Sequence, residues 1–276
     1  MGRECRQSRW SKTNHQLDSH EDSAMNQSES FDAIALLAQA DLVLITVDLL
    51  RPPSLHQQPF ASMGKADMVA LCAAAQLPAS DALADRLWCA VELAQTAEPS
   101  MWDGCWRLLF DASLYCPINE SAYIRRDKGA IIGDVCGFYR AFGWQSAANG
   151  ERPDHLLTEL EFVAMLLVMS ARATSQDQLD ITRQALERFT RDHLNDWIDA
   201  FAAKLQQTTT FPVLEATARW LPDLWHAMAE CHGWVLDPNP PLRSVPGQEP
   251  EEAYECGAPD VVALSAGQRS SSKTSP

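Results

Sequence analysis

The sequence predicts an all-α protein, folded as a single-domain helical bundle, and three observations support this fold class. Hydrophobic residues make up 46% of the 276 residues, while only 12 are glycine, a composition typical of a globular chain rich in helix. Apolar residues recur three and four positions apart along most of the chain, which is the helical period. Valine, isoleucine and threonine never alternate regularly with polar residues, so no strand signal competes with the helical one.

The two ends of the chain differ in composition from its body. Residues 1–30 are polar and lack apolar periodicity, so we expect a disordered N-terminal extension. Residues 237–276 are rich in Pro, Gly, Ser and Glu, and we expect a disordered acidic C-terminal tail. No repeat and no Pro/Gly-rich linker divides residues 31–236, so this segment is predicted to form one all-helical domain.

Helix-breaking residues mark the elements of the first half of this domain. Residues 31–50 form the first expected helix, with Ile34, Leu37, Leu44 and Ile45 facing inward, and Arg51-Pro52-Pro53 ends it. Helices over 65–76 and 80–96 follow, separated by Leu77-Pro78 and with Ser80 or Asp81 as the cap of the second. A further helix begins near Pro99 and runs to about residue 110. Its residues Trp106, Leu109 and Phe110 lie on one face, a stripe that is as typical of core packing as of a binding surface.

Residues 111–127 are predicted to form an irregular loop before a helix that ends at Gly143, a residue suited to a helix C-terminus. Gly129, Gly133 and Gly137 share one face of that helix. Each costs roughly 1 kcal/mol relative to alanine. Three on one face therefore indicate close backbone approach, either by another helix, which is the commoner reason, or by a bound peptide.

The second half of the domain is predicted to hold three long helices. The first runs over 153–171, with Pro153 at its first position and an apolar stripe that starts at Leu156. The next runs over 177–206 and ends at Thr208–Thr210. The last begins at Pro212 and ends near His232-Gly233, and we expect Pro222 to kink or divide it.

Charge and cysteine usage narrow the class of protein. The formal net charge is −15, and because residues 1–30 carry −1 and residues 237–276 carry −3, residues 31–236 carry −11. An acidic body argues against nucleic-acid binding and suits either a basic peptide partner or simple solubility. The eight cysteines form no C-x-x-C pair and mostly lie in apolar runs, which indicates reduced thiols and a cytoplasmic protein.

No membrane segment is predicted. Residues 1–10 lead into polar sequence rather than an apolar core, so a signal peptide is not expected. The longest apolar run, residues 33–50, contains Asp41 and Asp48, which makes a membrane span unfavourable.

The segment Glu151–Phe162 is the most conspicuous polar feature, because it places an Asp-His pair at the start of an apolar helix. Asp154 suits a cap in the first turn, and His155 and Glu159 are predicted to share one helical face. No phosphate-binding loop, nucleophile elbow or H-E-x-x-H motif is present. A metal-dependent helical enzyme using His155 is one alternative, although no other histidine pairs with it to complete a ligand set. A helical adaptor protein is another.

Together these segments resemble the TorD/DmsD/NarJ-type family of molybdoenzyme maturation chaperones, with the likeness spanning roughly residues 100–205. The pieces that carry it, in chain order, are Trp106-x-x-Leu109-Phe110, Pro117-x-x-Glu120-Ser121-x-Tyr123, Phe138-Tyr139-Arg140-Ala141-Phe142-Gly143, Glu151-Arg152-Pro153-Asp154-His155 with Glu159-Leu160-Glu161-Phe162, and Phe189-x-x-x-His193-Leu194-x-x-Trp197.

The resemblance implies a TorD-like all-α fold, no enzymatic activity, no cofactor and no metal. It implies a cytosolic chaperone that binds the N-terminal leader, usually a twin-arginine signal, of an apo-molybdopterin oxidoreductase. Such a chaperone delays export and assists molybdenum cofactor insertion, and acts as a monomer or dimer. The implied peptide-binding residues are Trp106, Leu109, Phe110, Pro117, Glu120, Ser121, Glu151, Asp154 and His155. The residues expected to hold the scaffold are Tyr139, Gly143, Pro153 and Glu159.

A leader of this kind joins basic residues to an apolar stretch, so its site needs an apolar surface beside carboxylates. Trp106, Leu109 and Phe110 are expected to supply the apolar surface. Asp154, with Glu120 or Glu151, is expected to supply the charge.

Overall fold

The computed structural model describes residues 33–242 apart from 56–59, 112–114 and 145–151. Residues 1–30, Glu151 and residues 243–276 of the predicted tail therefore lie outside the described residues. The described part is helical and contains no strand, only two isolated bridges, Asn119–His155 and Ile124–Leu242. The all-α prediction is confirmed.

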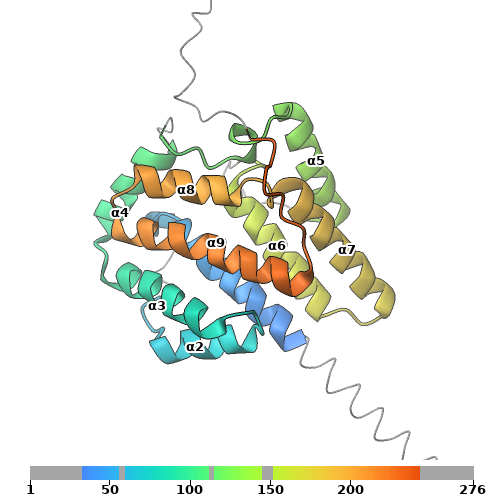
Figure 1. Cartoon of the computed structure of the whole chain (residues 1–276), viewed down its shortest axis with the longest axis horizontal. Coiled ribbons are helices and arrows are strands. Elements are labelled where there is room, and N and C mark those ends of the chain that lie inside the picture. Colours follow the sequence, from blue (N-terminus) through green and yellow to red (C-terminus); the bar gives the residue numbers. More distant parts are fainter. Residues whose placement is uncertain (1–32, 56–59, 112–114, 145–151, 243–276) are drawn as a thin grey trace, which may run out of the picture. The chain divides into compact units, whose positions relative to one another are not determined.

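A first helix, Ala33–Leu50, precedes the labelled helices. These are α2 (Lys65–Ala74), α3 (Ser80–Thr96), α4 (Pro99–Trp106), α5 (Lys128–Ala141), α6 (Leu156–Ala171), α7 (Gln176–His193), α8 (Ile198–Thr208) and α9 (Pro212–His232). In Figure 1, α9 lies between α8 and α3, while α5, α6 and α7 form the opposite part of the bundle. Short helical turns follow the first helix, continue α4 and precede α5: Pro53–Leu55, Arg107–Asp111 and Glu120–Ala122.

The first helix joins these layers. The indole Nε1 of Trp220 in α9 donates to Thr46 Oγ1 at 2.8 Å, and that of Trp106 in α4 donates to the Leu50 carbonyl at 2.7 Å. By length and composition this helix could cross a membrane, but 67% of it is buried inside the protein, as in a core helix.

The inward face predicted for the first helix is wrong for three of its four residues. Ile34, Leu37 and Leu44 are exposed, and only Ile45 is buried. The helix is apolar almost all round, so its own pattern does not select a face. Its contacts with α4 and α9 decide which side is covered. The predicted end at Leu50 before Pro52 is confirmed.

The predictions for α3, for α7 with α8, and for α9 need correction. Ala79, not Ser80 or Asp81, stands at the α3 N-cap. The single helix predicted over 177–206 is two, because the turn at 194–197 buries the Trp197 indole, which donates to the His193 carbonyl. Helix α9 continues through Pro222 undivided.

Residues 234–242, here called the strap, leave α9 after Gly233 and run as irregular chain with a bend at 238–239. Gly233 has a φ of 70°, the left-handed conformation that suits a helix end. Asn195 Nδ2 donates to the Val235 carbonyl at 3.1 Å, and the Arg125 amide donates to the Pro241 carbonyl at 2.9 Å. The strap is therefore held against the turn after α7 and the loop before α5.

Candidate functional site

The aromatic residues predicted to bind a peptide are buried in the core. Trp106, Leu109 and Phe110 are each at most 8% exposed. The rings of Trp106 and Phe110 lie 5.4 Å apart, and Phe110 stacks on Phe201 of α8 at 6.3 Å. The stripe is thus part of the core in this structure, which is the packing alternative that the sequence left open.

The polar motif residues also lie inside the protein. Glu120, Asp154, Glu159 and His193, here called the buried polar cluster, come from three elements and the turn before α6, and none is more than 2% exposed. His193 Nδ1 lies 3.0 Å from Glu120 Oε2. This contact ties the end of α7 to the loop before α5, although 73 residues separate the two in sequence.

Asp154 links the start of α6 to the same loop. Its Oδ2 accepts from Arg152 Nη2 at 2.6 Å and from the Ser121 amide at 3.3 Å, and its carbonyl accepts from the Glu120 amide at 2.9 Å. Arg152 also donates to Ser121 Oγ at 2.8 Å. Asp154 and Ser121, both predicted binding residues, are therefore brought together as a structural joint and not as an exposed charge.

Glu159 is completely buried beside two other carboxyl groups. Burial raises the pKa of Glu159 well above its usual value, and the charges of Glu120 and Asp154 raise that pKa further. Neither carboxyl oxygen of Glu159 has a hydrogen-bond partner among the described residues, so no donor stabilises the ionised form. Its neutral state avoids placing a further negative charge in the core.

His155 is the N-cap of α6 and not a residue of its first turn. Its Nδ1 accepts from the Leu157 amide at 3.3 Å. Burial lowers the pKa of His155 to about 4, so the ring is neutral and can accept that bond. The predicted helix start at Pro153 is therefore wrong, because α6 begins at Leu156. Consequently His155 and Glu159 do not share a helical face.

The residues assigned to the scaffold have structural contacts. Tyr139 donates its hydroxyl to the Pro153 carbonyl at 2.9 Å, which fixes the turn before α6 to α5. Gly143 has a φ of 65° directly after α5, where a left-handed residue ends a helix. Pro117, one of the predicted peptide-binding residues, is half-buried, and its carbonyl accepts the Tyr123 hydroxyl at 2.7 Å.

The metal alternative gains no support from the described residues. Within 33–242, outside the gaps, no group of three or more His, Cys, Asp and Glu side chains is placed to hold a metal ion. His155 uses its Nδ1 as a helix cap, and His193 contacts Glu120. A catalytic zinc site needs three such ligands.

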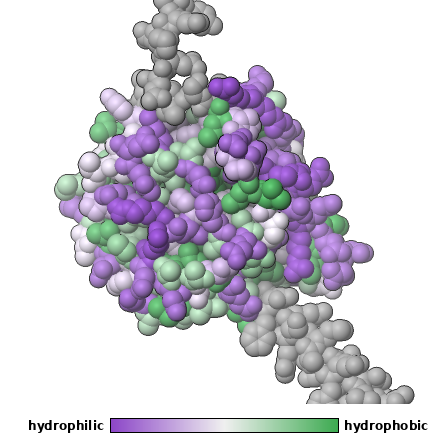
Figure 2. Space-filling model, in the orientation of Figure 1, coloured by the Kyte–Doolittle hydropathy of each residue, from purple (hydrophilic) through white to green (hydrophobic). Residues whose placement is uncertain are grey.

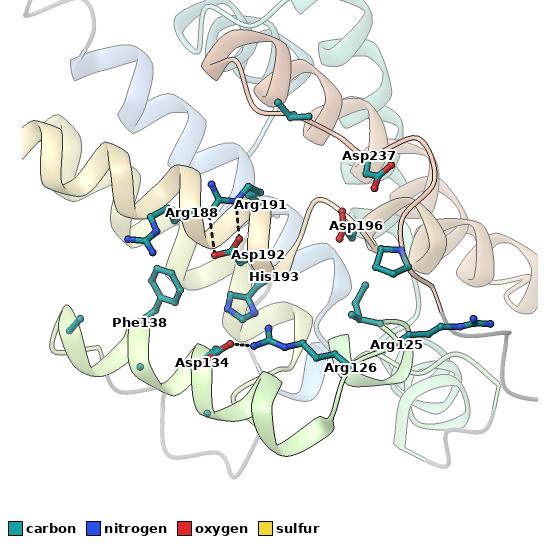
Figure 3. Close-up of a pocket in the computed structure, with 16 residues that line it drawn as sticks. Arg125, Arg126, Asp134, Phe138, Arg188, Arg191, Asp192, His193, Asp196 and Asp237 are labelled. Atoms are coloured by element: carbon teal, nitrogen blue, oxygen red, sulfur yellow. Dashed lines mark hydrogen bonds and ion pairs between the residues drawn. The ribbon is translucent and has the colours of Figure 1, made fainter.

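A groove of about 1010 Å³ lies between α5, the end of α7 and the strap, and is here called the α5–α7 groove (Figure 3). On the face shown in Figure 2, hydrophobic residues form only small patches among hydrophilic ones. A partner on this face therefore has no broad apolar surface to cover, whereas the groove offers a concave site.

The glycine face of α5 opens into this groove. Gly133 and Gly137 line it, and a Cβ at either would meet nothing within 4 Å. No described helix packs there, so the described residues give no support to helix packing as the reason for Gly133 and Gly137. At Gly129, a Cβ would lie 3.1 Å from Asp127 Oδ1, which accepts the Ala130 amide as the α5 cap. Gly129 is therefore explained by the start of the helix.

The groove and the buried polar cluster meet at His193. This residue lines the groove and contacts Glu120 beneath it. Phe138 stands at the edge of the groove, and its ring contacts His193 edge-on at 5.7 Å. The residues emphasised by the sequence motifs thus lie under the groove and position its wall.

Sequence reasoning missed the charged residues of the groove. Arg126 pairs with Asp134, and Arg191 pairs with Asp192 at 2.8 Å. Arg188, Asp196 and Asp237 also line it, from α7, the turn after α7 and the strap (Figure 3). No local pattern reveals these three, because only the α7–α8 break and the path of the strap bring them to one site.

Comparison with known proteins gives matches to a nitrate reductase delta subunit profile and to proteins named as chaperones. A sequence profile described as nitrate reductase delta subunit matches residues 75–203. A protein named chaperone protein TorD, from Vibrio cholerae serotype O1, is 35% identical over 103 residues, which cover 36% of this chain and 47% of that protein. A selenate reductase assembly chaperone protein from Thauera selenatis is 36% identical over 84 residues, which cover 29% of this chain and 43% of that protein.

The matched segment includes the buried polar cluster and the α5 and α7 walls of the groove, but not the strap. The chain spans less than half the length of these curated relatives. Both of these relatives are named as chaperones.

Proposed function

We propose, from the premise that this chain belongs to the TorD/DmsD/NarJ-type family of maturation chaperones, that it assists the assembly of a reductase. Its client is a molybdopterin oxidoreductase in the apo form, and it acts in the cytoplasm as a client-specific chaperone. It binds the client's N-terminal leader, of the twin-arginine type, and holds the enzyme back from export while the molybdenum cofactor is inserted.

The observation that carries leader binding is the α5–α7 groove. It is a concave site in a helical domain, and its floor, formed by Gly133 and Gly137, is not covered by any described element. A leader is an extended or helical segment that needs both apolar contact and charge. The groove combines an aromatic edge at Phe138 with carboxylates at Asp196 and Asp237.

The buried motif residues support this site from below. Because Asp154, Glu120 and Phe110 are nearly inaccessible, we assign them to positioning the groove wall and not to direct contact with the leader. Direct contact by Trp106, Leu109 and Phe110 would require the α4 region to open. Substitutions at these buried positions would disturb folding and binding together, so surface variants give the cleaner test.

Calorimetry tests the proposal. The titrants are synthetic peptides that copy the N-termini of molybdopterin oxidoreductases encoded near the gene for this chain, with scrambled peptides of the same composition as controls. At least one leader peptide is expected to bind the full chain with micromolar or tighter affinity, and its scrambled form is not. Failure of every leader to bind would overturn leader binding.

A test in cells addresses the maturation role. Deleting the gene for this chain is expected to lower the molybdenum content and activity of the client reductase while its transcript level stays unchanged. A client with full cofactor content in the deletion strain would contradict a role in cofactor insertion.

A further inference from the structure

The floor of the α5–α7 groove permits close approach by a bound segment. Gly133 and Gly137 lie one helical turn apart on α5, and the space above both is open. In a helix interior each glycine costs roughly 1 kcal/mol relative to alanine. No contact within the described chain repays that cost, whereas a partner backbone packed against α5 would do so.

One end of the groove carries two carboxylates, Asp196 and Asp237, for which no ion pair is formed among the described residues, and Arg125 also lines the groove on this side. Asp196 and Asp237 approach each other there (Figure 3). Partial burial raises the pKa of the Asp196 carboxyl, and the carboxylates of Asp237 and Asp192 raise it further. A basic side chain bound there would relieve the repulsion.

The other end of the groove has the opposite character. Figure 3 shows Arg188 beside Phe138, on the far side of the groove from Asp196 and Asp237. Arg188 is exposed and lines the groove. A basic residue placed at this end would be repelled, and an apolar one would meet the Phe138 ring.

We propose that the α5–α7 groove holds the leader in one direction, with a basic residue between Asp196 and Asp237 and the following apolar residues against Gly133, Gly137 and Phe138. This inference rests on the leader binding proposed above. It adds the location of the leader, the direction in which the leader lies, and the residues that bind its arginine. It commits to one occupant, the N-terminal leader of the client, because charge and shape complement such a segment.

The charge arm of the test uses fluorescence anisotropy at low salt with the full chain. One labelled peptide carries two adjacent arginines before an apolar stretch, and a second has both arginines replaced by glutamine. The double variant Asp196→Asn/Asp237→Asn is expected to weaken binding of the arginine peptide about tenfold or more and to leave the glutamine peptide unchanged. The double variant Asp81→Asn/Glu92→Gln, at two exposed residues of α3 and with the same change in charge, is the control and should alter the binding of neither peptide.

The second part of the test examines the floor of the groove by replacing glycine with leucine at two positions, one in the groove and one outside it. Gly137→Leu is expected to weaken binding of both peptides at least tenfold, because its side chain fills the groove. Gly104→Leu is the matched control, since Gly104 is also helical and has open space where its Cβ would stand, but it lies in α4. Thermal unfolding checks that both variants fold.

The outcomes separate this inference from the proposed function. If the wild type prefers the arginine peptide but the aspartate variant retains that preference, the arginine is read elsewhere and the inference is wrong, while leader binding stands. If Gly104→Leu weakens binding and Gly137→Leu does not, the site lies on the α4 face and the inference is again wrong. If the wild type binds neither peptide nor any client leader, both proposals fail.

Discussion

The buried polar cluster and the α5–α7 groove share His193 but differ in how they are built. The cluster collects Glu120, Asp154 and Glu159 from segments far apart in sequence and seals them from water. The groove is formed by exposed charges and by glycines with open space above them. The motif residues that resemble a binding site are thus buried beneath the groove and support its wall. The surface that can contact a partner is formed by residues that no local sequence pattern identifies.

Among the substitutions that distinguish the cluster from the groove, removal of Glu120 should cause the largest loss in the free energy of unfolding. Glu120→Ala leaves His193 without its partner in a nearly inaccessible site, and we expect a loss of about 3 kcal/mol or more in the free energy of unfolding. Glu120→Gln keeps an acceptor and should lose less. Urea unfolding measures both. A loss below about 1 kcal/mol for Glu120→Ala would contradict a structural role for the cluster.

The pH dependence of stability tests whether Glu159 is protonated. Because the pKa of Glu159 is raised in the folded state, the folded protein binds a proton that the unfolded chain has released above its usual value of 4.5. Stability from this group is complete below that value and declines as pH rises toward the folded pKa, by at most about 1.4 kcal/mol per pH unit.

Glu159→Gln should remove that decline. We expect the stability of the wild type relative to the variant to fall between pH 5 and pH 8, as measured by urea unfolding at each pH. Glu92→Gln, an exposed residue of α3, serves as the control and should follow the wild type. A constant difference between wild type and Glu159→Gln across this range would show that Glu159 does not hold an additional proton.

Substitution of the groove glycines should stabilise the protein, whereas substitution of the buried residues should destabilise it. Gly133→Ala and Gly137→Ala introduce a methyl group into open space within α5, and each should stabilise the free protein by roughly 0.5–1 kcal/mol. Gly129→Ala should gain less, because its Cβ would press on the Asp127 cap. Thermal unfolding compares the three. A destabilised Gly137→Ala would mean that another segment of the chain covers the groove.

The smallest effect should come from the ion pair at the rim of the groove. Arg126 and Asp134 are both largely solvated, so a double-mutant cycle with Arg126→Ala and Asp134→Ala should give a coupling energy of at most about 1 kcal/mol. That energy should shrink at high salt. A coupling energy as large as the loss in the free energy of unfolding caused by Glu120→Ala would contradict the difference between the solvated groove and the buried cluster.

Sequence patterns predicted several helix ends, for local reasons. Pro52 lacks an amide hydrogen and follows the end of the first helix, and Gly143 and Gly233 adopt left-handed backbone after α5 and α9. The motif pieces around Pro117, Glu120 and Asp154 do lie together. Their depth below the surface was not predictable, because a carboxylate in a motif looks the same whether exposed or buried.

The sequence by itself therefore determined the helical class, the family resemblance and the helix ends that depend on single residues, since these follow from local sterics and periodicity. Tertiary structure alone decided which side of the first helix is covered, where α7 gives way to α8, and that Asp196 and Asp237 meet at one end of a groove. The physical reason is that burial and charge proximity depend on which segments pack together, and no local spacing encodes that.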